Sequence, residues 1–247
     1  MHELLPGSRD VHMASLPLPR NRLLSALSAR DRRLLLPHLT LVPLALRQSL
    51  EKPNTRIGSV YFIEEGFASI VGGGAGHHQP RTEVGLIGPE GLTGISVVLG
   101  DDRSPHETFI QAAGRGHRMP AAELRKAMAA SVSLRAFLLK FVQTLIIQTA
   151  QTAFANRRAD IVERLARWVL MADDRLGRGS LPLTHELLAI MLGVRRAGVT
   201  EAVNVLVSEG LIQASPGQIR VRNRKGLERR ANGTYGVPEA EYRRLIG

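Results

Sequence analysis

The sequence predicts an α+β fold in three parts: an N-terminal antiparallel β-barrel or jelly roll, a long helix, and a small C-terminal domain with two short helices and a β-hairpin. Three observations predict it. Short apolar runs alternate with turn residues up to about position 120, neither glycine nor proline occurs from Ala121 to Leu176, and two amphipathic segments meet at Gly193. We therefore divide the chain into a flexible tail, a barrel domain, a long helix and a C-terminal domain, at residues 1–20, 21–130, 131–158 and 159–247.

Composition and charge narrow the class of protein. The chain has 33 Lys and Arg against 22 Asp and Glu, and the formal net charge of +11 favours a polyanionic partner, either nucleic acid or an anionic membrane surface. It has no cysteine, which excludes disulfides, cysteine-ligated zinc and iron–sulfur clusters. An apolar run of about 18 residues is missing, and so is a signal peptide. We expect a cytoplasmic protein with no membrane partner.

The barrel domain is predicted from one helix and a series of short strands. The helix is expected over Asn21–Leu36. The apolar runs have strand character, and the glycines between them predict tight turns. The runs are Ser59–Ile63, Ala68–Val71, Glu83–Ile87 and Phe109–Ala112, and the turns are Glu65-Gly66, Gly72–Gly74, Gly88-Pro89 and Gly114. The cluster Gly72–Gly76 lacks the lysine and the following helix of a phosphate loop, so it predicts a hairpin tip.

The stretch from Ala121 to Leu176 predicts one long helix and, after a break, a second helix over about Asp160–Arg175 with one buried face. Apolar residues recur along the long helix at spacings of three and four. This stripe is wider than one helix needs to cover a small barrel, so we expect part of it to form a homodimer seam. Packing inside its own chain is the alternative. The seam residues would be Leu134, Leu138, Phe141 and Leu145.

The C-terminal domain begins with two predicted helices. Thr184 can cap a helix over His185–Leu192, because its hydroxyl can accept from a free backbone N–H. Gly193 ends that helix, where glycine adopts positive φ without penalty. A second helix, Arg195–Ser208, has its buried positions at Val199, Ala202, Val203 and Leu206. This is a helix-turn-helix, whose second helix enters the major groove of DNA.

A β-hairpin, or wing, follows the helix-turn-helix. Leu211–Ala214 and Ile219–Val221 flank a tight turn over Ser215–Gln218. Basic residues on and after the hairpin suit contact with DNA phosphates, and a solvated charged face is the alternative. The phosphate contacts would be Arg220, Arg222 and Lys225, within a basic set that continues through Arg224, Arg229 and Arg230 and is opposed in sequence only by Glu228.

This pattern resembles the winged helix-turn-helix of the Crp/Fnr family of bacterial transcription regulators. The resemblance in the helix-turn-helix rests on Thr184, Ala189, Gly193, Arg196 and Val199. Segments of the N-terminal domain are similar to the family's cyclic-nucleotide-binding-like effector barrel, and one segment is similar to its linker. These are Asn21–Leu36, Leu50–Asn54, Val60–Gly66 and Val84–Gly91 in the barrel, and Ala166–Leu170 in the linker.

The resemblance implies a homodimer that binds double-stranded DNA at a pseudo-palindromic operator, with RNA polymerase as a further candidate partner. Arg196 matches the family's guanine-contacting arginine, and a guanidinium fits guanine O6 and N7 in bidentate fashion. Glu201 and Thr200 are further candidates for base contact, and Arg195 and Thr184 for phosphate contact. Ala197 and Glu201 stand where well-known members often carry Glu and Arg, so the operator sequence does not transfer.

In family members that bind cyclic AMP, a Gly-Glu pair contacts the ribose and an Arg-Ser pair the cyclic phosphate. The matching pocket residues are Gly88, Glu90, Gly91, Arg103 and Ser104. Pro89 interrupts the Gly-Glu pair and lacks an N–H, and Asp101 and Asp102 weaken the positive field of Arg103. A cyclic nucleotide is therefore disfavoured, and we expect a barrel that binds an unknown effector or none.

Two other functions compete with DNA-binding regulation. One is a ligand-binding regulatory module that acts on a protein partner, against which the basic wing argues. The other is an enzyme built around the barrel, which would need an inward-facing cluster of histidines and carboxylates that the sequence lacks. His77 and His78 are a candidate for haem or metal ligation, but a surface pair in a glycine-rich loop is the favoured alternative, and no metal site is predicted.

Overall fold

The computed structural model describes residues 19–73, 81–177 and 179–247. Its N-terminal domain is a five-stranded antiparallel sheet, as predicted, with β3 (Ser59–Gly73) and β5 (Glu107–Pro120) as central strands. The strands β1 and β2 pair with β5, and β4 pairs with β3. These outer strands span Thr40–Leu44, Ser49–Glu51 and Arg81–Ile87. The predicted hairpin tip falls between β3 and β4, mostly outside the described residues.

Two predicted turns are wrong, because Gly66 and Gly114 lie inside long strands. Gly66 has a φ of +79°, and the register between β3 and β5 shifts on either side of it. A Cβ on Gly114 would lie 2.0 Å from the carbonyl oxygen of Glu65 on the neighbouring strand. Both glycines therefore permit a bulge and a close approach of backbones. From sequence alone, a glycine inside a strand cannot be distinguished from a glycine that ends one.

The helical segments are more divided than predicted. The single helix expected over Asn21–Leu36 is two helices, because the Ser28 hydroxyl accepts from the Asp31 N–H and starts a new one. The stretch predicted as two helices holds three, since Ser131 caps a further helix by accepting from the Leu134 N–H. The helices of the first two thirds of the chain are α1 (Arg22–Ala26), α2 (Ala29–Leu35), η1 (Leu36–His38), α3 (Ile95–Leu99), α4 (Ala121–Ala130), α5 (Val132–Arg158) and α6 (Ile161–Leu176).

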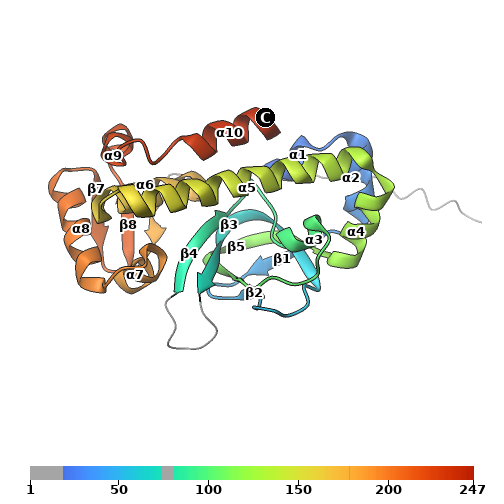
Figure 1. The fold of residues 1–247 in the computed structure, drawn as a ribbon, viewed down its shortest axis with the longest axis horizontal. Helices are drawn as coiled ribbons and strands as arrows, with labels where there is room; N and C mark the ends of the chain where they lie inside the picture. Colours follow the sequence, from blue (N-terminus) through green and yellow to red (C-terminus); the bar gives the residue numbers. More distant parts are fainter. Residues whose placement is uncertain (1–18, 74–80, 178) are drawn as a thin grey trace, which may run out of the picture.

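Figure 1 shows α5 running the length of the molecule, with the barrel on one side and α10 on the other. The helix-turn-helix and the wing lie at the C-terminal end of α5. From there the chain turns back, so that α10 packs along α5. The elements of this C-terminal part are β6 (Leu181–Pro182), α7 (His185–Leu192), α8 (Arg196–Ser208), β7 (Ile212–Ser215), β8 (Gln218–Val221), α9 (Arg224–Arg230) and α10 (Val237–Ile246).

Helix α6 is buried on more than the one face predicted, because it lies between the barrel and the helix-turn-helix. Ten of its residues, Val162 and the run Leu165–Asp173, are buried. The Trp168 ring meets the Phe67 ring of β3 edge-on at 6.4 Å between centroids. Its Nε1 donates to Glu83 Oε1 of β4 at 2.7 Å. One helix thus belongs to the cores of both domains.

The apolar stripe on α5 faces its own barrel. Leu134, Leu138, Phe141 and Leu145 are 0, 0, 1 and 8% exposed and belong to the barrel core. A Cβ on Gly91 would lie 2.2 Å from Phe141 Cζ, so this contact needs a glycine. For these four residues the alternative, packing within the chain, describes the structure. By length and composition α5 could also span a membrane, but a core helix packed on a barrel passes the same test.

Candidate nucleic-acid interface

The helix-turn-helix has the local geometry that the sequence predicts. The Thr184 hydroxyl accepts from the Leu187 N–H at 3.2 Å and caps α7. Gly193 ends α7 with a φ of +63°. A Cβ there would also lie 2.9 Å from Thr82 Oγ1, so the turn lies against strand β4 of the barrel. Arg195 is the N-cap of α8, one residue before the helix proper.

Helix α8 has one buried and one exposed face. Val199, Ala202, Val203 and Leu206 are buried as predicted and hold α8 against α6 and α7. Arg196, Glu201 and Asn204 are exposed. Among the described residues Glu201 forms no ion pair with Arg196, so it does not hold that guanidinium. Both side chains are therefore exposed at the surface and do not bond to each other.

The Thr200 hydroxyl, a candidate for base contact, is used inside the motif. It donates to the carbonyl of Arg196 at 3.2 Å and lies 2.9 Å from His185 Nδ1 on α7. Thr200 is also half-buried. These contacts join the two helices and leave the hydroxyl poorly placed to contact a base.

A cleft of about 420 Å³ lies between α8 and the wing. Arg196 and Asn204 enter it from α8, Thr184 and His185 from α7, and the wing turn Ala214–Gly217 closes the other side. A guanidinium suits guanine, and a carboxamide suits adenine N6 and N7. Sequence reasoning missed Asn204, although a spacing of two helical turns from Arg196 puts both residues on the same face of α8.

The wing is the hairpin of β7 and β8, and its turn is closed by Gly217 with a φ of +71°. Arg220 is exposed on β8, Arg222 is exposed just after that strand, and Lys225 is exposed on α9. The Arg222 guanidinium donates to the side chain of Gln213 on β7, whereas Arg220 has no ion pair in the part of the chain that the structure describes. These three cations lie where they could meet DNA phosphates.

Two further arginines of the basic set, Arg224 and Arg230, are neutralised within the chain. Arg224 lies 3.1 Å from Asp173 and 2.7 Å from Asp174 of α6, and 3.0 Å from Glu228. Arg230 lies 3.4 Å from Glu209. In sequence only Glu228 opposes this set, but the fold brings other carboxylates to it. Arg224 and Arg230 therefore join α9 to the rest of the domain.

The five residues predicted for an effector pocket do not come together. Glu90 is buried, and its Oε1 lies 2.6 Å from Arg175 of α6. Gly91 packs on α5, and the exposed Arg103 lies 3.5 Å from Asp102. Only Ser104 lines the large cavity between the sheet and α5. The Gly88–Gly91 turn contacts the domain junction, where Gly88 and Glu90 lie against Arg175 of α6.

The cavity between the sheet and α5 has a volume of about 560 Å³ and mostly apolar walls, including Ile70, Val84 and Ile95. Among the described lining residues there is no arginine or lysine. Glu51 lines it and accepts from the Gly94 N–H at 2.8 Å, and burial raises the pKa of this carboxyl. Such a surface does not suit a cyclic phosphate, which needs a cation.

Within residues 19–73, 81–177 and 179–247, no group of three or more His, Asp or Glu side chains could hold a metal ion. His77 and His78 lie outside those ranges.

One protein-family model and several solved structures are similar to this chain. The Crp-like helix-turn-helix domain matches residues 163–230. Among solved structures, FixK2 from Bradyrhizobium japonicum is 17% identical, with a TM-score of 0.66 over 77% of this chain and 96% of its own. The c-di-GMP-responsive global regulator CLP from Xanthomonas campestris is 16% identical, with a TM-score of 0.61 over 78 and 99%.

A transcriptional regulator of the CRP family from Thermus thermophilus is 17% identical, with a TM-score of 0.61 over 78% of this chain and 97% of its own. At these identities the three likenesses establish the fold. No curated protein matches the chain.

Proposed function

We propose that this chain, a DNA-binding transcription regulator of the Crp/Fnr type, acts as a homodimer that binds a two-fold symmetric operator through α8. The observation that carries the proposal is the cleft between α8 and the wing, which Arg196 and Asn204 enter together. Family and fold are those of transcription regulators, which are not enzymes. The cytoplasm as its compartment and RNA polymerase as a further partner belong to the same proposal.

The exposed side chains divide into two roles. Arg196 would pair with guanine and Asn204 with adenine in the major groove, which specifies the sequence. Arg195, Arg220 and Lys225 would contact phosphates, which fixes the position of the protein without reading bases. The exposed Glu201 carboxylate can accept from cytosine N4.

The homodimer proposal uses a face of α5 different from the one the sequence suggested. Along the helix, exposed residues recur with alternating spacings of four and three, which is the heptad pattern of paired helices. Val132, Leu139 and Ile146 are 73, 41 and 57% exposed, which is unusual for large apolar side chains. The full set is Val132, Ala136, Leu139, Gln143, Ile146, Ala150, Ala153 and Arg157, and we call it the α5 seam.

A second copy of the chain fits the α5 seam better than another partner, because a heptad stripe is complementary to itself and its alanines permit close approach. Since α8 lies at the C-terminal end of α5 (Figure 1), parallel pairing would place both α8 helices at one end of the dimer. Two half-sites about 34 Å apart on one face of DNA require that arrangement.

The experiment is selection of binding sites from a random DNA pool, followed by affinity measurements at fixed salt. We expect a two-fold symmetric site. Arg196→Ala should cost about 1–3 kcal/mol and relax the preference at one position of each half-site. Arg33→Ala on α2 removes the same charge from the barrel domain. It should leave both the affinity and the sequence preference unchanged. If no site is enriched, the protein-partner alternative gains support.

The dimer is tested separately by sedimentation of Ile146→Glu, with Arg135→Glu as an exposed α5 control outside the seam. Ile146→Glu should sediment as a monomer and bind half-sites weakly, while Arg135→Glu should remain a dimer. A dimeric Ile146→Glu variant would contradict the seam.

A further inference from the structure

The C-terminal segment of residues 231–247 connects the DNA-binding domain back to the barrel, and we call it the strap. The Tyr242 hydroxyl donates to the carbonyl of Glu90 at 2.8 Å, and both Tyr242 and Ile246 belong to the barrel core. Nearer the DNA-binding domain, the carbonyl of Thr234 accepts from Arg167 Nε of α6 at 3.0 Å. The strap therefore contacts each domain through buried groups.

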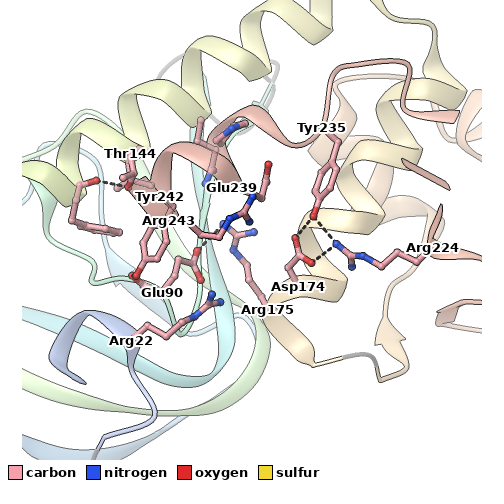
Figure 2. A pocket seen from close by; sticks show the side chains of 14 residues that line it. Arg22, Glu90, Thr144, Asp174, Arg175, Arg224, Tyr235, Glu239, Tyr242 and Arg243 are labelled. Carbon is pink, nitrogen blue, oxygen red and sulfur yellow. Dashed lines mark hydrogen bonds and ion pairs between the residues drawn. The ribbon is translucent and has the colours of Figure 1, made fainter. Parts of the chain in front are cut away.

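Under the strap lies a cavity of about 260 Å³, shown in Figure 2. Its volume is that of about nine water molecules, which is enough for a small metabolite. Arg22 and Glu90 line it from the barrel side, Gln148 from α5, Arg175 from α6, and Tyr242 and Arg243 from α10. The cavity thus brings both domains, α5 and the strap together.

The arginines of this cavity differ in whether their charge is matched. Arg175 lies 2.6 Å from Glu90, and Arg224 lies 2.7 Å from Asp174, so both are paired. Arg22 and Arg243 have no acidic partner among the residues the structure describes. The Arg22 guanidinium lies over the Tyr242 ring, 5.8 Å from its centroid. The lining holds these four arginines against the three carboxylates of Glu90, Asp174 and Glu239, which leaves the cavity with one excess positive charge.

We propose that this cavity binds a small organic anion, through a carboxylate or phosphate group held between the guanidinium groups of Arg22 and Arg243. Both groups are exposed and can reorient, and a guanidinium binds either oxyanion in bidentate fashion. Tyr242 provides an aromatic wall beside Arg22. The site is separate from the cavity between the sheet and α5 and from the DNA-binding cleft.

A ligand at this site would affect how the two domains are joined. Arg22 belongs to the barrel domain and Arg243 to the strap, so an anion between them closes the strap on the barrel. The strap in turn holds α6 through Thr234 and Arg167. A bound anion therefore stabilises the arrangement in which α6, and with it the helix-turn-helix, is fixed against the barrel.

The experiment is isothermal titration of the full chain, without DNA, with citrate, 3-phosphoglycerate and inorganic phosphate. We expect one site per chain for at least one of the two organic probes, and weaker binding of inorganic phosphate. Arg22→Gln and Arg243→Gln should each reduce the affinity at least tenfold. Arg244→Gln is the matched control, because Arg244 is the next residue on α10, pairs with Glu241 at 2.6 Å and does not line the cavity.

Two results would overturn the proposal: neither organic probe binds at millimolar concentration, or Arg244→Gln loses as much affinity as Arg243→Gln, which would indicate surface charge alone. Circular dichroism of each variant verifies folding. The fluorescence of Trp168, the single tryptophan, gives a second readout at the domain junction. Since DNA is absent, failure here would leave the DNA-binding proposal intact.

Discussion

In the helix-turn-helix, the residues predicted to form one motif lie together in the structure. In the barrel, the residues predicted to form one pocket lie apart. Thr184, Gly193 and Arg196 lie within a few helical turns, and each occupies the position its local pattern predicts. In the barrel domain the turn at Gly88–Gly91 and the pair Arg103-Ser104 are also near in sequence. In the fold, however, Glu90 lies at the domain junction and Ser104 lines the cavity under α5.

The difference teaches which kind of site a sequence can specify. A capped helix, a glycine turn and a second helix are determined by backbone preferences and by residues within four positions. An effector pocket is determined by how a sheet and a distant helix pack. A short motif can therefore be present in the sequence although its residues do not form a pocket. The following predictions test this contrast, from the largest expected effect to the smallest.

The largest effect is expected where the two faces of α5 are compared. Leu138 is fully buried against the barrel, so Leu138→Ala should reduce the free energy of unfolding by about 2–5 kcal/mol at every protein concentration. Leu139 is 41% exposed on the α5 seam, so the cost of Leu139→Ala should be smaller and should depend on concentration. Urea unfolding at two concentrations measures both. If the loss of unfolding free energy in Leu138→Ala depended on protein concentration, Leu138 would lie in the dimer interface, as the sequence suggested.

The second prediction concerns the contact between barrel and α6. Glu83 is buried and accepts from Ser69 Oγ and Trp168 Nε1, both at 2.7 Å. Burial raises the pKa of its carboxyl from 4.5 to about 7, against the lowering effect of these bonds. The folded protein therefore binds a proton more tightly than the unfolded chain. This contribution is fully present below about pH 4.5 and is lost as the pH rises through about 7.

The size of this contribution is on the order of 3 kcal/mol. Glu83→Gln keeps an acceptor for Trp168 but cannot titrate. We expect the wild-type free energy of unfolding to fall relative to that of Glu83→Gln between pH 5 and 7, measured by urea unfolding and by Trp168 fluorescence. Parallel pH profiles of the two proteins would show that Glu83 is not the titrating group.

Much of the fold could be predicted from sequence, and the failures have a common cause. The Thr184 cap and the start of a helix near Asp160 depend on local sequence, and both were predicted. The four residues predicted for a dimer seam on α5 pack on the barrel instead, because Leu138 and Leu139 are both apolar and only the barrel decides which of them is buried. Two partners of Arg224, Asp173 and Asp174, are on α6, and Asp173 is 51 residues away in sequence, so no local pattern shows them.

The third prediction separates the two roles assigned to Thr184. As a cap it accepts from Leu187, and Thr184→Ala should cost about 1 kcal/mol of stability. As a lining residue of the DNA cleft it could also contact phosphate. Thr184→Asp keeps the cap but repels phosphate. Stability retained with weaker DNA binding would establish both roles, and unchanged DNA binding would limit Thr184 to the cap.

The smallest effect is expected on the wing, where Arg220 in β8 and Arg222 just after it make a matched pair. Arg220 has no ion pair within the described residues, while Arg222 is bonded to Gln213. If Arg220 neutralises one phosphate, Arg220→Ala should weaken binding by a similar factor on every DNA sequence. It should also reduce the slope of log affinity against log salt by about 1. Arg222→Ala should reduce the slope less, because its guanidinium is partly engaged within the hairpin. A change in sequence preference in Arg220→Ala, with the salt slope unchanged, would mean that the wing reads bases, and that the division between α8 and wing is drawn in the wrong place.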